Sequence, residues 1–379
     1  MLLELFRSLA DGFPALNVFN YLTLRAVLAA LTSMAIGFAL GPWMIARLKN
    51  LHFGQAVRTD GPKTHLVKDG TPTMGGALIL FAITVSTLLW ADLSNRFIWV
   101  VLFVTLGYGS IGWIDDYRKV VHHNPKGMSA REKFSWQSVI GLAAAFYLVF
   151  ALSVPAGGTL TETIAGWVEA GFPLDISSNL HLLIPCFKDI ALPLGLVGFM
   201  VFTYVVIVGS SNAVNLTDGI DGLCSCVTVV YMAAFACISG ILGMYCETLL
   251  ALLTAGGCIG FLMWNFPPAK VFMGDTGSMF LGGVVCALGV GCGAEFLMLM
   301  AALVYICEAL SVVIQVTVFK ITKKIYHTKE GKRLFKMTPI HHHFELSGWS
   351  ELKIDVVFSL TAAVLGAGAV LLAMNMFAR

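Results

Sequence analysis

Long apolar runs separated by short polar segments make up most of this chain. The ten runs cover residues 22–46, 74–91, 97–114, 136–155, 190–209, 223–244, 249–266, 278–294, 296–319 and 354–377. Most reach, or nearly reach, the roughly 20 residues that a helix needs to cross ~30 Å of hydrocarbon. The weakest, 278–294, is short and rich in glycine. This pattern predicts an all-α polytopic membrane protein with ten transmembrane helices, forming a single integral membrane domain over residues 1–379.

The composition supports an integral membrane protein. Of the 379 residues, 58% are hydrophobic and only 12% are charged, whereas soluble domains have about 25% charged residues. The net charge of +2 is too small to indicate a nucleic-acid partner. The nine cysteines lie mostly inside apolar runs and include no CxxC pair, so we interpret them as small apolar side chains. Residues 1–20 lack a basic region followed by a short apolar core, and no cleavable signal peptide is expected.

Basic residues gather in alternate loops. Of the 24 lysines and arginines, 19 lie in the loops 44–73, 115–135, 209–222, 266–277 and 320–353. The positive-inside rule then places these five loops in the cytoplasm and both termini on the external, periplasmic side. Three of the five loops carry carboxylates directly at the end of an apolar run, which predicts one active-site cleft at the cytoplasmic face. The long external segment 156–189 could form a small hairpin or a surface helix, and it indicates no function.

The most polar stretch at membrane depth is 212–222. Asn212, Asn215, Asp218 and Asp221 recur every third residue, so neighbouring pairs would meet on a helix surface. Gly219 and Gly222 would let the backbone turn away. The stretch is either a helix end followed by a glycine-rich turn or a functional site, and ionisable groups at membrane depth favour the site.

The adjacent pair Asp115-Asp116 ends the third run. Neighbouring side chains on a helix point about 100° apart, so one aspartate should face the cleft while the other supports it. Alternatively, the pair is a charged helix end with Arg118 and Lys119 as partners.

Two further loops contain turn residues directly before an apolar run. Asp275 could cap a helix beginning near Thr276, and its carboxylate could equally hold Mg²⁺ while the nearby amides face phosphate oxygens. The stretch Lys68–Gly76 repeats the order of turn, threonine and helix start, but it matches no phosphate-binding loop. Glycine-mediated helix packing explains Gly75 and Gly76 equally well.

Three consecutive histidines, His341, His342 and His343, follow a basic stretch from Lys320 to Lys336. They cannot all face one tetrahedral metal ion, although His341 and His343 would share a side if the segment is extended. Because Mg²⁺ prefers oxygen ligands, the imidazoles are better suited to contact phosphate than the ion.

Four motifs in order resemble those of the phospho-N-acetylmuramoyl-pentapeptide transferase (MraY) family, within the polyprenyl-phosphate N-acetylhexosamine-1-phosphate transferase superfamily. They are Asp115-Asp116, Asn215–Gly222, Phe272–Gly277 and His341–Glu345. The resemblance spans the chain from the first run to the last. It implies transfer of phospho-MurNAc-pentapeptide from UDP-MurNAc-pentapeptide to undecaprenyl phosphate, with lipid I and UMP as products. It also implies a Mg²⁺ cofactor that Mn²⁺ could replace, a homodimer, and a place in the bacterial cytoplasmic (inner) membrane.

The same resemblance assigns roles to individual residues. Asp275 would be the metal ligand, and Phe272 would stack on uracil. The implied catalytic residues are Asp115, Asp116, Asp218, Asp275, His341, His342 and His343. The implied substrate-binding residues are Lys68, Thr73, Asn215, Gly219, Asp221 and Phe272.

General chemistry limits what these residues need to do. A phosphate monoester has a second pKa near ~6, so the attacking lipid phosphate is mostly deprotonated at neutral pH. We therefore expect metal holding and orientation to contribute more than proton abstraction by Asp115. A covalent phospho-aspartate route stays open.

Two other functions fit parts of the pattern. A relative that transfers a different sugar phosphate to the same lipid would keep the aspartates and the ion. A transporter is the alternative from another class, because intramembrane acids such as Glu308 often line ion paths. The crowding of polar groups at one face favours an enzyme at the membrane surface, and Glu308 receives no role from the sequence.

Overall fold

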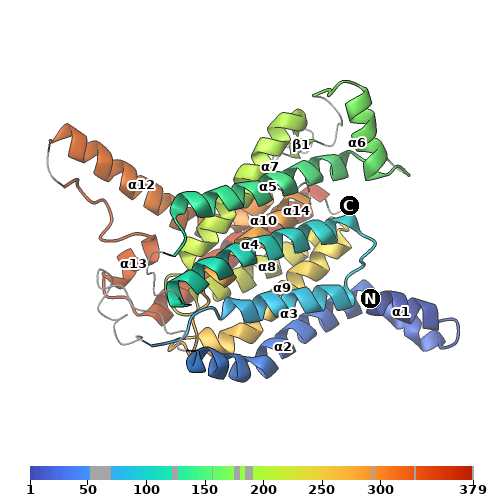
Figure 1. The fold of residues 1–379 in the computed structure, drawn as a ribbon, viewed down its shortest axis with the longest axis horizontal. Coiled ribbons are helices and arrows are strands. Elements are labelled where there is room, and N and C mark those ends of the chain that lie inside the picture. Colours follow the sequence, from blue (N-terminus) through green and yellow to red (C-terminus); the bar gives the residue numbers. More distant parts are fainter. Residues whose placement is uncertain are drawn as a thin grey trace.

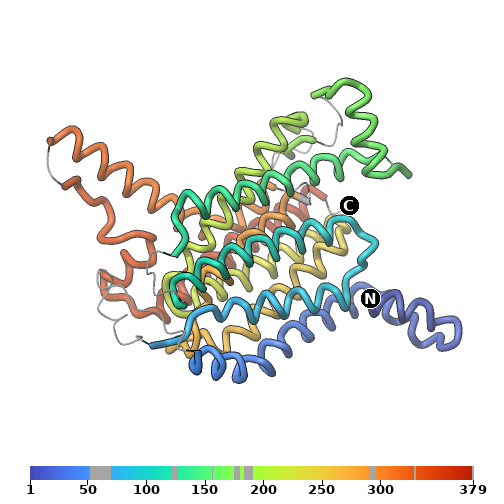
Figure 2. Tube along the Cα trace, in the orientation of Figure 1, coloured from blue at the N-terminus to red at the C-terminus, as the bar shows by residue number. Residues whose placement is uncertain are grey.

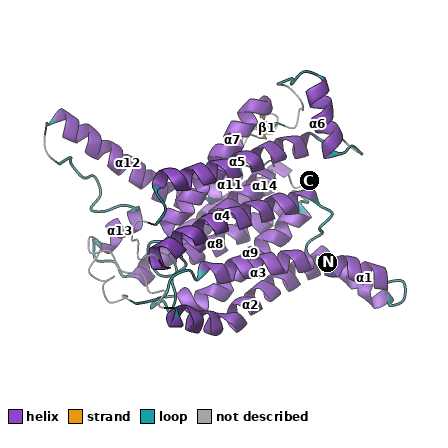
Figure 3. Ribbon diagram, in the orientation of Figure 1, coloured by secondary structure: helices purple, strands orange, loops and turns teal. Residues whose placement is uncertain are grey.

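The chain is almost entirely helical in the computed structural model (Figure 3). The structure describes residues 1–51, 70–121, 127–155, 157–174, 180–183, 191–291, 293, 295–327 and 330–377. Within these residues, the seven cysteines that the structure describes as free form no disulfide.

Among the residues that the structure describes, eight helices are long and apolar enough to cross a membrane. They are α2 (Leu22–Asn50), α4 (Arg96–Val121), α5 (Ala130–Ser153), α7 (Gly195–Thr217), α8 (Leu223–Ile241), α9 (Tyr245–Asn265), α12 (Leu303–Ile325) and α14 (Glu351–Phe377). Two shorter apolar helices, α3 (Gly76–Trp90) and α10 (Gly274–Gly291), account for the remaining two predicted runs. The predicted all-α polytopic membrane fold is confirmed, whereas ten crossings and their orientation stay predictions.

Hydropathy marks the apolar part of a helix, and the helix ends fall elsewhere. The run 97–114 belongs to α4, which continues to Val121, because a helix satisfies its own backbone hydrogen bonds after the side chains become polar. Asp115 and Asp116 therefore lie on a helix and not in a loop. The run 296–319 falls on two helices, α11 (Glu295–Ala301) and the first part of α12.

The smaller elements lie outside the long helices. They are α1 (Leu2–Leu9), the 3-10 helix η1 (Pro14–Asn20), α6 (Leu160–Glu169), β1 (His181–Leu183), β2 (Ala191–Pro193) and α13 (Ile340–Glu345). Thr159 caps α6 in a capping box with Glu162. Strands β1 and β2 pair antiparallel, with Leu182 opposite Leu192. The segment predicted as a hairpin or a surface helix thus contributes both a helix and one strand of a hairpin.

The long helices run side by side, and α10 lies in the middle of the bundle, where it packs against α4 and α7 (Figures 1 and 2). A Cβ at Gly112 of α4 would overlap the backbone carbonyl of Asp275, so glycine at this position allows α4 to reach the start of α10. Both chain ends marked in Figure 1 lie at the opposite end of the bundle from α13. The end with α13 also contains the start of α10 and the end of α4. Most of the predicted site residues lie at this end.

Candidate functional site

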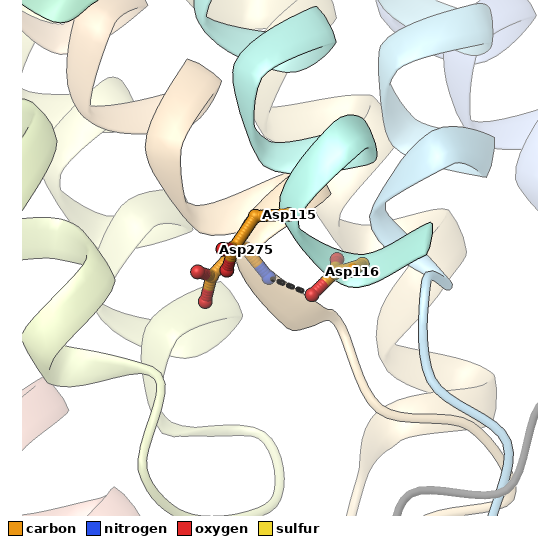
Figure 4. Close-up of side chains that lie close together, drawn as sticks. All are labelled: Asp115, Asp116 and Asp275. Carbon is orange, nitrogen blue, oxygen red and sulfur yellow. Dashed lines mark hydrogen bonds between the residues drawn. The ribbon is translucent and has the colours of Figure 1, made fainter. Parts of the chain in front are cut away.

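Three aspartates from two helices form a cluster at this end (Figure 4). Asp115 and Asp116 lie near the end of α4, and Asp275 lies in the first turn of α10. One carboxylate oxygen from each lies within 4.8 Å of the others. Residues that are 159 or more positions apart in the sequence thus meet because α4 and α10 pack closely.

Asp116 holds the beginning of α10 in place. Its Oδ2 accepts hydrogen bonds from the backbone N–H of Thr276 at 2.8 Å and from the Thr276 hydroxyl at 2.7 Å. Its Oδ1 accepts from the backbone N–H of Asp275 at 3.3 Å, the bond drawn in Figure 4. A carboxylate also interacts favourably with the positive end of the helix dipole. The capping role considered for Asp275 therefore belongs to Asp116, whose carboxylate comes from another helix.

Asp115 and Asp275 share two lysines. Lys119 Nζ lies 2.6 Å from Asp115 Oδ2 and 3.2 Å from Asp275 Oδ2. Lys133 Nζ, from the first turn of α5, lies 2.9 Å and 2.5 Å from the same two oxygens. Asp115 is fully buried, and its Oδ1 also accepts from the backbone N–H of Met128 at 2.6 Å. Three carboxylates and two ammonium groups leave this cluster with a formal charge of −1.

The donor set of the cluster suits a hard divalent cation. Mg²⁺ prefers oxygen ligands and commonly takes one or two protein carboxylates together with substrate phosphates. Asp115 and Asp275 direct their carboxylates at a common point, while the Asp116 oxygens are engaged with α10. Asp115 and Asp275 could therefore hold an ion, while Asp116 supports that arrangement through its bonds to α10.

The end of α7 adds an amide and a fourth acid. Asn215 Nδ2 donates to Asp275 Oδ1 at 3.0 Å and to Ser278 Oγ at 2.9 Å, so α7 and α10 are joined beside the cluster. Asp218 follows the last residue of α7 and accepts from the backbone N–H of Gly274. Burial raises the pKa of Asp218 well above its ordinary value, and the negative charges of Asp275 and Asp116 add to the effect.

The segments before α3 and α10 run together beside the cluster. Phe272 N donates to Pro72 O at 2.8 Å, and Gly75 N donates to Phe272 O at 2.8 Å. Thr73 is buried there, with its hydroxyl near Gly274, and the N-cap of α3 is Gly75 without a side-chain cap. The threonine is therefore not the cap of this helix. Lys68 lies outside the described residues.

Asp221 supports the loop that precedes α10. Its Oδ2 accepts from the backbone N–H of Ala269 at 2.9 Å, which holds the loop that leads to Phe272. Asn265 supports the same loop by accepting from Gly222 N at 3.1 Å and donating to Val271 O at 3.0 Å.

The three histidines lie on a helix, α13, and therefore point in different directions. His341 is fully buried, and its ring lies against Gly219, where a Cβ would overlap Nε2. His342 Nδ1 lies 3.1 Å from Glu345 Oε2. His343 Nδ1 accepts from the backbone N–H of Lys336 at 3.1 Å. His341 and His343 would share a side only in an extended segment. Residues Ile340–Glu345 instead form a helix.

Sequence reasoning missed Lys133 and gave Lys119 only a helix-end role. Each is one of many cations in the loops predicted to be cytoplasmic, and nothing in its local sequence distinguishes it from an anchor for lipid headgroups. Of the helix-end partners considered, Lys119 contacts both Asp115 and Asp116, whereas Arg118 instead pairs with Glu132 at 2.9 Å. Glu308, which received no role, pairs with His341 at 3.1 Å.

One family of known proteins matches the part of the chain that contains this cluster. The family model of glycosyl transferase family 4 matches residues 98–293, which is more than half of the chain and includes the aspartate cluster and the end of α7. Together with the membrane-spanning helices and the carboxylate cluster, this match shows that the chain belongs to glycosyl transferase family 4, within the superfamily of polyprenyl-phosphate sugar-1-phosphate transferases.

Proposed function

We propose that this chain transfers phospho-MurNAc-pentapeptide from UDP-MurNAc-pentapeptide to undecaprenyl phosphate, giving lipid I and UMP in a bacterial cytoplasmic membrane. The observation that carries the choice of sugar is the position of α13. The histidine motif is the one that most resembles phospho-N-acetylmuramoyl-pentapeptide transferases, and His341 lies directly on Gly219, beside Asp218. The basic stretch from Lys320 to Lys336 precedes it, which suits a peptide with free carboxylates.

The arrangement supports the chemistry of phosphoryl transfer. Attack of the lipid phosphate on the pyrophosphate spreads negative charge over phosphate oxygens, so fixed cationic donors contribute most. Lys119 and Lys133 supply such donors beside Asp115 and Asp275. Mg²⁺ held by these two carboxylates would neutralise further charge on the phosphates. The lipid phosphate needs little help in losing a proton, so Asp115 acts chiefly by holding and orienting.

Several elements of the proposal rest on the resemblance. Phe272 stacks on uracil, while Lys68, Thr73, Asn215, Gly219 and Asp221 bind the substrate. Two copies of the chain form a homodimer. Mn²⁺ can replace Mg²⁺.

Release of UMP by the purified protein tests the proposal. We expect UDP-MurNAc-pentapeptide to be used at least ~100-fold more efficiently than UDP-GlcNAc, which is about 2.7 kcal/mol in transition-state binding. Undecaprenyl phosphate and Mg²⁺ should both be required. Comparable use of UDP-GlcNAc would instead assign the chain to a relative with another sugar. Transport of a solute without UMP release would contradict enzymatic transfer.

A further inference from the structure

A buried ionisable pair joins α12 to α13 beside the turn that contains Asp218 and Gly219. Glu308 lies on the first half of α12, and His341 lies in the first turn of α13. His341 Nδ1 and Glu308 Oε2 are 3.1 Å apart, and both side chains are completely buried. In the part of the chain that the structure describes, the second carboxylate oxygen, Glu308 Oε1, has no hydrogen-bond partner.

The other ring nitrogen of His341 lies against the turn that contains Gly219. Nε2 is buried and has no partner among the described residues, and it is the atom that a Cβ at Gly219 would overlap. The imidazole therefore stands on the backbone of the turn that contains Asp218, and only a glycine leaves room for it there. A buried ring nitrogen without a partner is costly, and a substrate atom that reaches this turn would supply the missing hydrogen bond.

Packing alone does not account for a glutamate at position 308. Its neighbours on α12 are mainly apolar, and a buried pair of this kind is seldom more stable than apolar residues of similar size. Ionisable groups at membrane depth are costly and usually serve function. An ionised carboxylate can only accept hydrogen bonds, so Nδ1–H donates to Glu308, and in the imidazolium form Nε2–H is left as a second donor on the other side of the ring.

We infer that Glu308 is a positioning residue for the transfer reaction, which accepts a hydrogen bond from Nδ1–H and holds the His341 imidazolium in one orientation, so that Nε2–H donates to a phosphate oxygen of the substrate beside Gly219. Glu308 itself touches no substrate. The inference rests on the proposed function only in requiring a phosphate-bearing substrate, and it does not depend on which sugar is transferred.

The proposal distinguishes two substitutions at position 308. Glu308→Gln keeps the shape, but an amide can either donate to Nδ1 or accept from it, so the ring nitrogens are no longer assigned. We expect kcat to fall about 10–100-fold, the usual range for a partner that orients a functional imidazole, with KM for the sugar nucleotide changed less than ~3-fold. Glu308→Asp keeps an acceptor-only group and should recover part of the loss.

A double-mutant cycle with His341→Asn decides whether Glu308 acts through His341. UMP release is measured for both single variants and for the double variant, with whichever sugar nucleotide the wild-type protein uses. If the inference holds, Glu308→Gln lowers kcat no further once His341 is replaced. Glu295→Gln is the matched control, since Glu295 is equally an acid of the bundle, is 3% exposed, and lies on α11 away from α13. Its kcat should stay within ~2-fold of wild type.

Independent, multiplying losses in the double variant overturn the inference while leaving the proposed function intact. A fall in kcat for Glu295→Gln equal to that for Glu308→Gln also overturns it, because any buried acid would then give the same effect. Absence of UMP release from the wild-type protein with every sugar nucleotide contradicts the proposed function and the inference together. If Glu308→Gln does not fold, as judged by its melting curve and size-exclusion profile, the same cycle with Glu308→Asp decides the question.

Discussion

The charge balance of the aspartate cluster predicts opposite effects of two substitutions on the response to Mg²⁺. Asp275→Asn changes the formal charge of the cluster from −1 to zero, because it removes one of three carboxylates that face Lys119 and Lys133. Lys133→Gln changes it from −1 to −2. The first should raise the concentration of Mg²⁺ that gives half-maximal activity, and the second should lower it.

The short distances in the cluster set the size of the effect. Asp275 Oδ2 lies 2.5 Å from Lys133 Nζ and 3.2 Å from Lys119 Nζ. Unit charges ~4 Å apart interact by about 4 kcal/mol at an effective dielectric constant of ~20. Rearrangement of the lysines will offset much of this interaction energy. If one third of the energy remains, it still changes the equilibrium of Mg²⁺ binding about tenfold. We therefore expect the Mg²⁺ concentration for half-maximal activity to rise at least ~10-fold in Asp275→Asn and to fall at least ~3-fold in Lys133→Gln.

Turnover should fall in both variants, for different reasons. Asp275→Asn loses an ion ligand, and we expect kcat/KM to drop at least ~100-fold, or about 2.7 kcal/mol. Lys133→Gln loses a cationic donor to phosphate oxygens.

The assay is UMP release titrated with Mg²⁺ after removal of metal by EDTA. Lys270→Gln serves as the control, because Lys270 is an exposed lysine near Trp264 and outside the cluster. Its Mg²⁺ dependence should match the wild type. A shift of both cluster variants in the same direction would refute the charge-balance argument, and activity that is unchanged by EDTA would refute the metal site itself.

Three further predictions concern the cap of α10, the pKa of Asp218 and the orientation of the chain in the membrane. Asp116→Ala should lower the free energy of unfolding by about 2–3 kcal/mol and turnover with it, because Thr276 loses its charged acceptor; chemical denaturation and UMP release measure the two effects. Asp218 has a raised pKa, so above pH ~4 the folded, metal-free chain keeps a proton that the unfolded chain releases. The free energy of unfolding therefore falls as the pH rises from ~4 towards the raised pKa. Asp218→Asn should remove this fall, which melting curves in EDTA at pH 5 to 8 would detect, while turnover is lost. A cysteine at Lys270 should resist an impermeant thiol reagent in intact cells while one at Glu169 reacts, and the reverse result would contradict the predicted orientation.

The fold was predictable because membrane helices are specified by a strong local signal. An apolar run of roughly 20 residues has few alternatives to a helix in hydrocarbon, where each backbone polar group must be satisfied within the segment. The ends of the helices were less predictable. Ile114 ends the apolar run of α4, yet the helix continues to Val121, because hydropathy does not report the hydrogen bonds that continue a helix into polar sequence. The division between α11 and α12 near Ala302 likewise occurs inside one apolar run.

The site was predictable where residue type alone limits the options. Acids at the ends of apolar runs are rare enough to indicate Asp115 and Asp275, and the structure brings them together. Their lysine partners were not predictable, because Lys133 meets Asp275 across 142 positions of sequence and resembles any other lysine of the predicted cytoplasmic loops. The helical form of α13 was also hidden, and it determines that His341 faces inward.

The lysines also explain how a group of buried carboxylates can fold in the absence of substrate. Asp115 is completely buried, and an unpaired buried carboxylate is costly, so Lys119 and Lys133 must compensate the cluster before an ion and a phosphate arrive. The same lysines would otherwise repel an arriving cation, and the remaining charge of −1 limits that repulsion. A bound Mg²⁺ would change the formal charge of the cluster from −1 to +1, which would favour binding of the anionic phosphates of the proposed substrate. Under the proposed function, the numbers of aspartates and lysines therefore set the charge that the site presents first to the ion and then to the substrate.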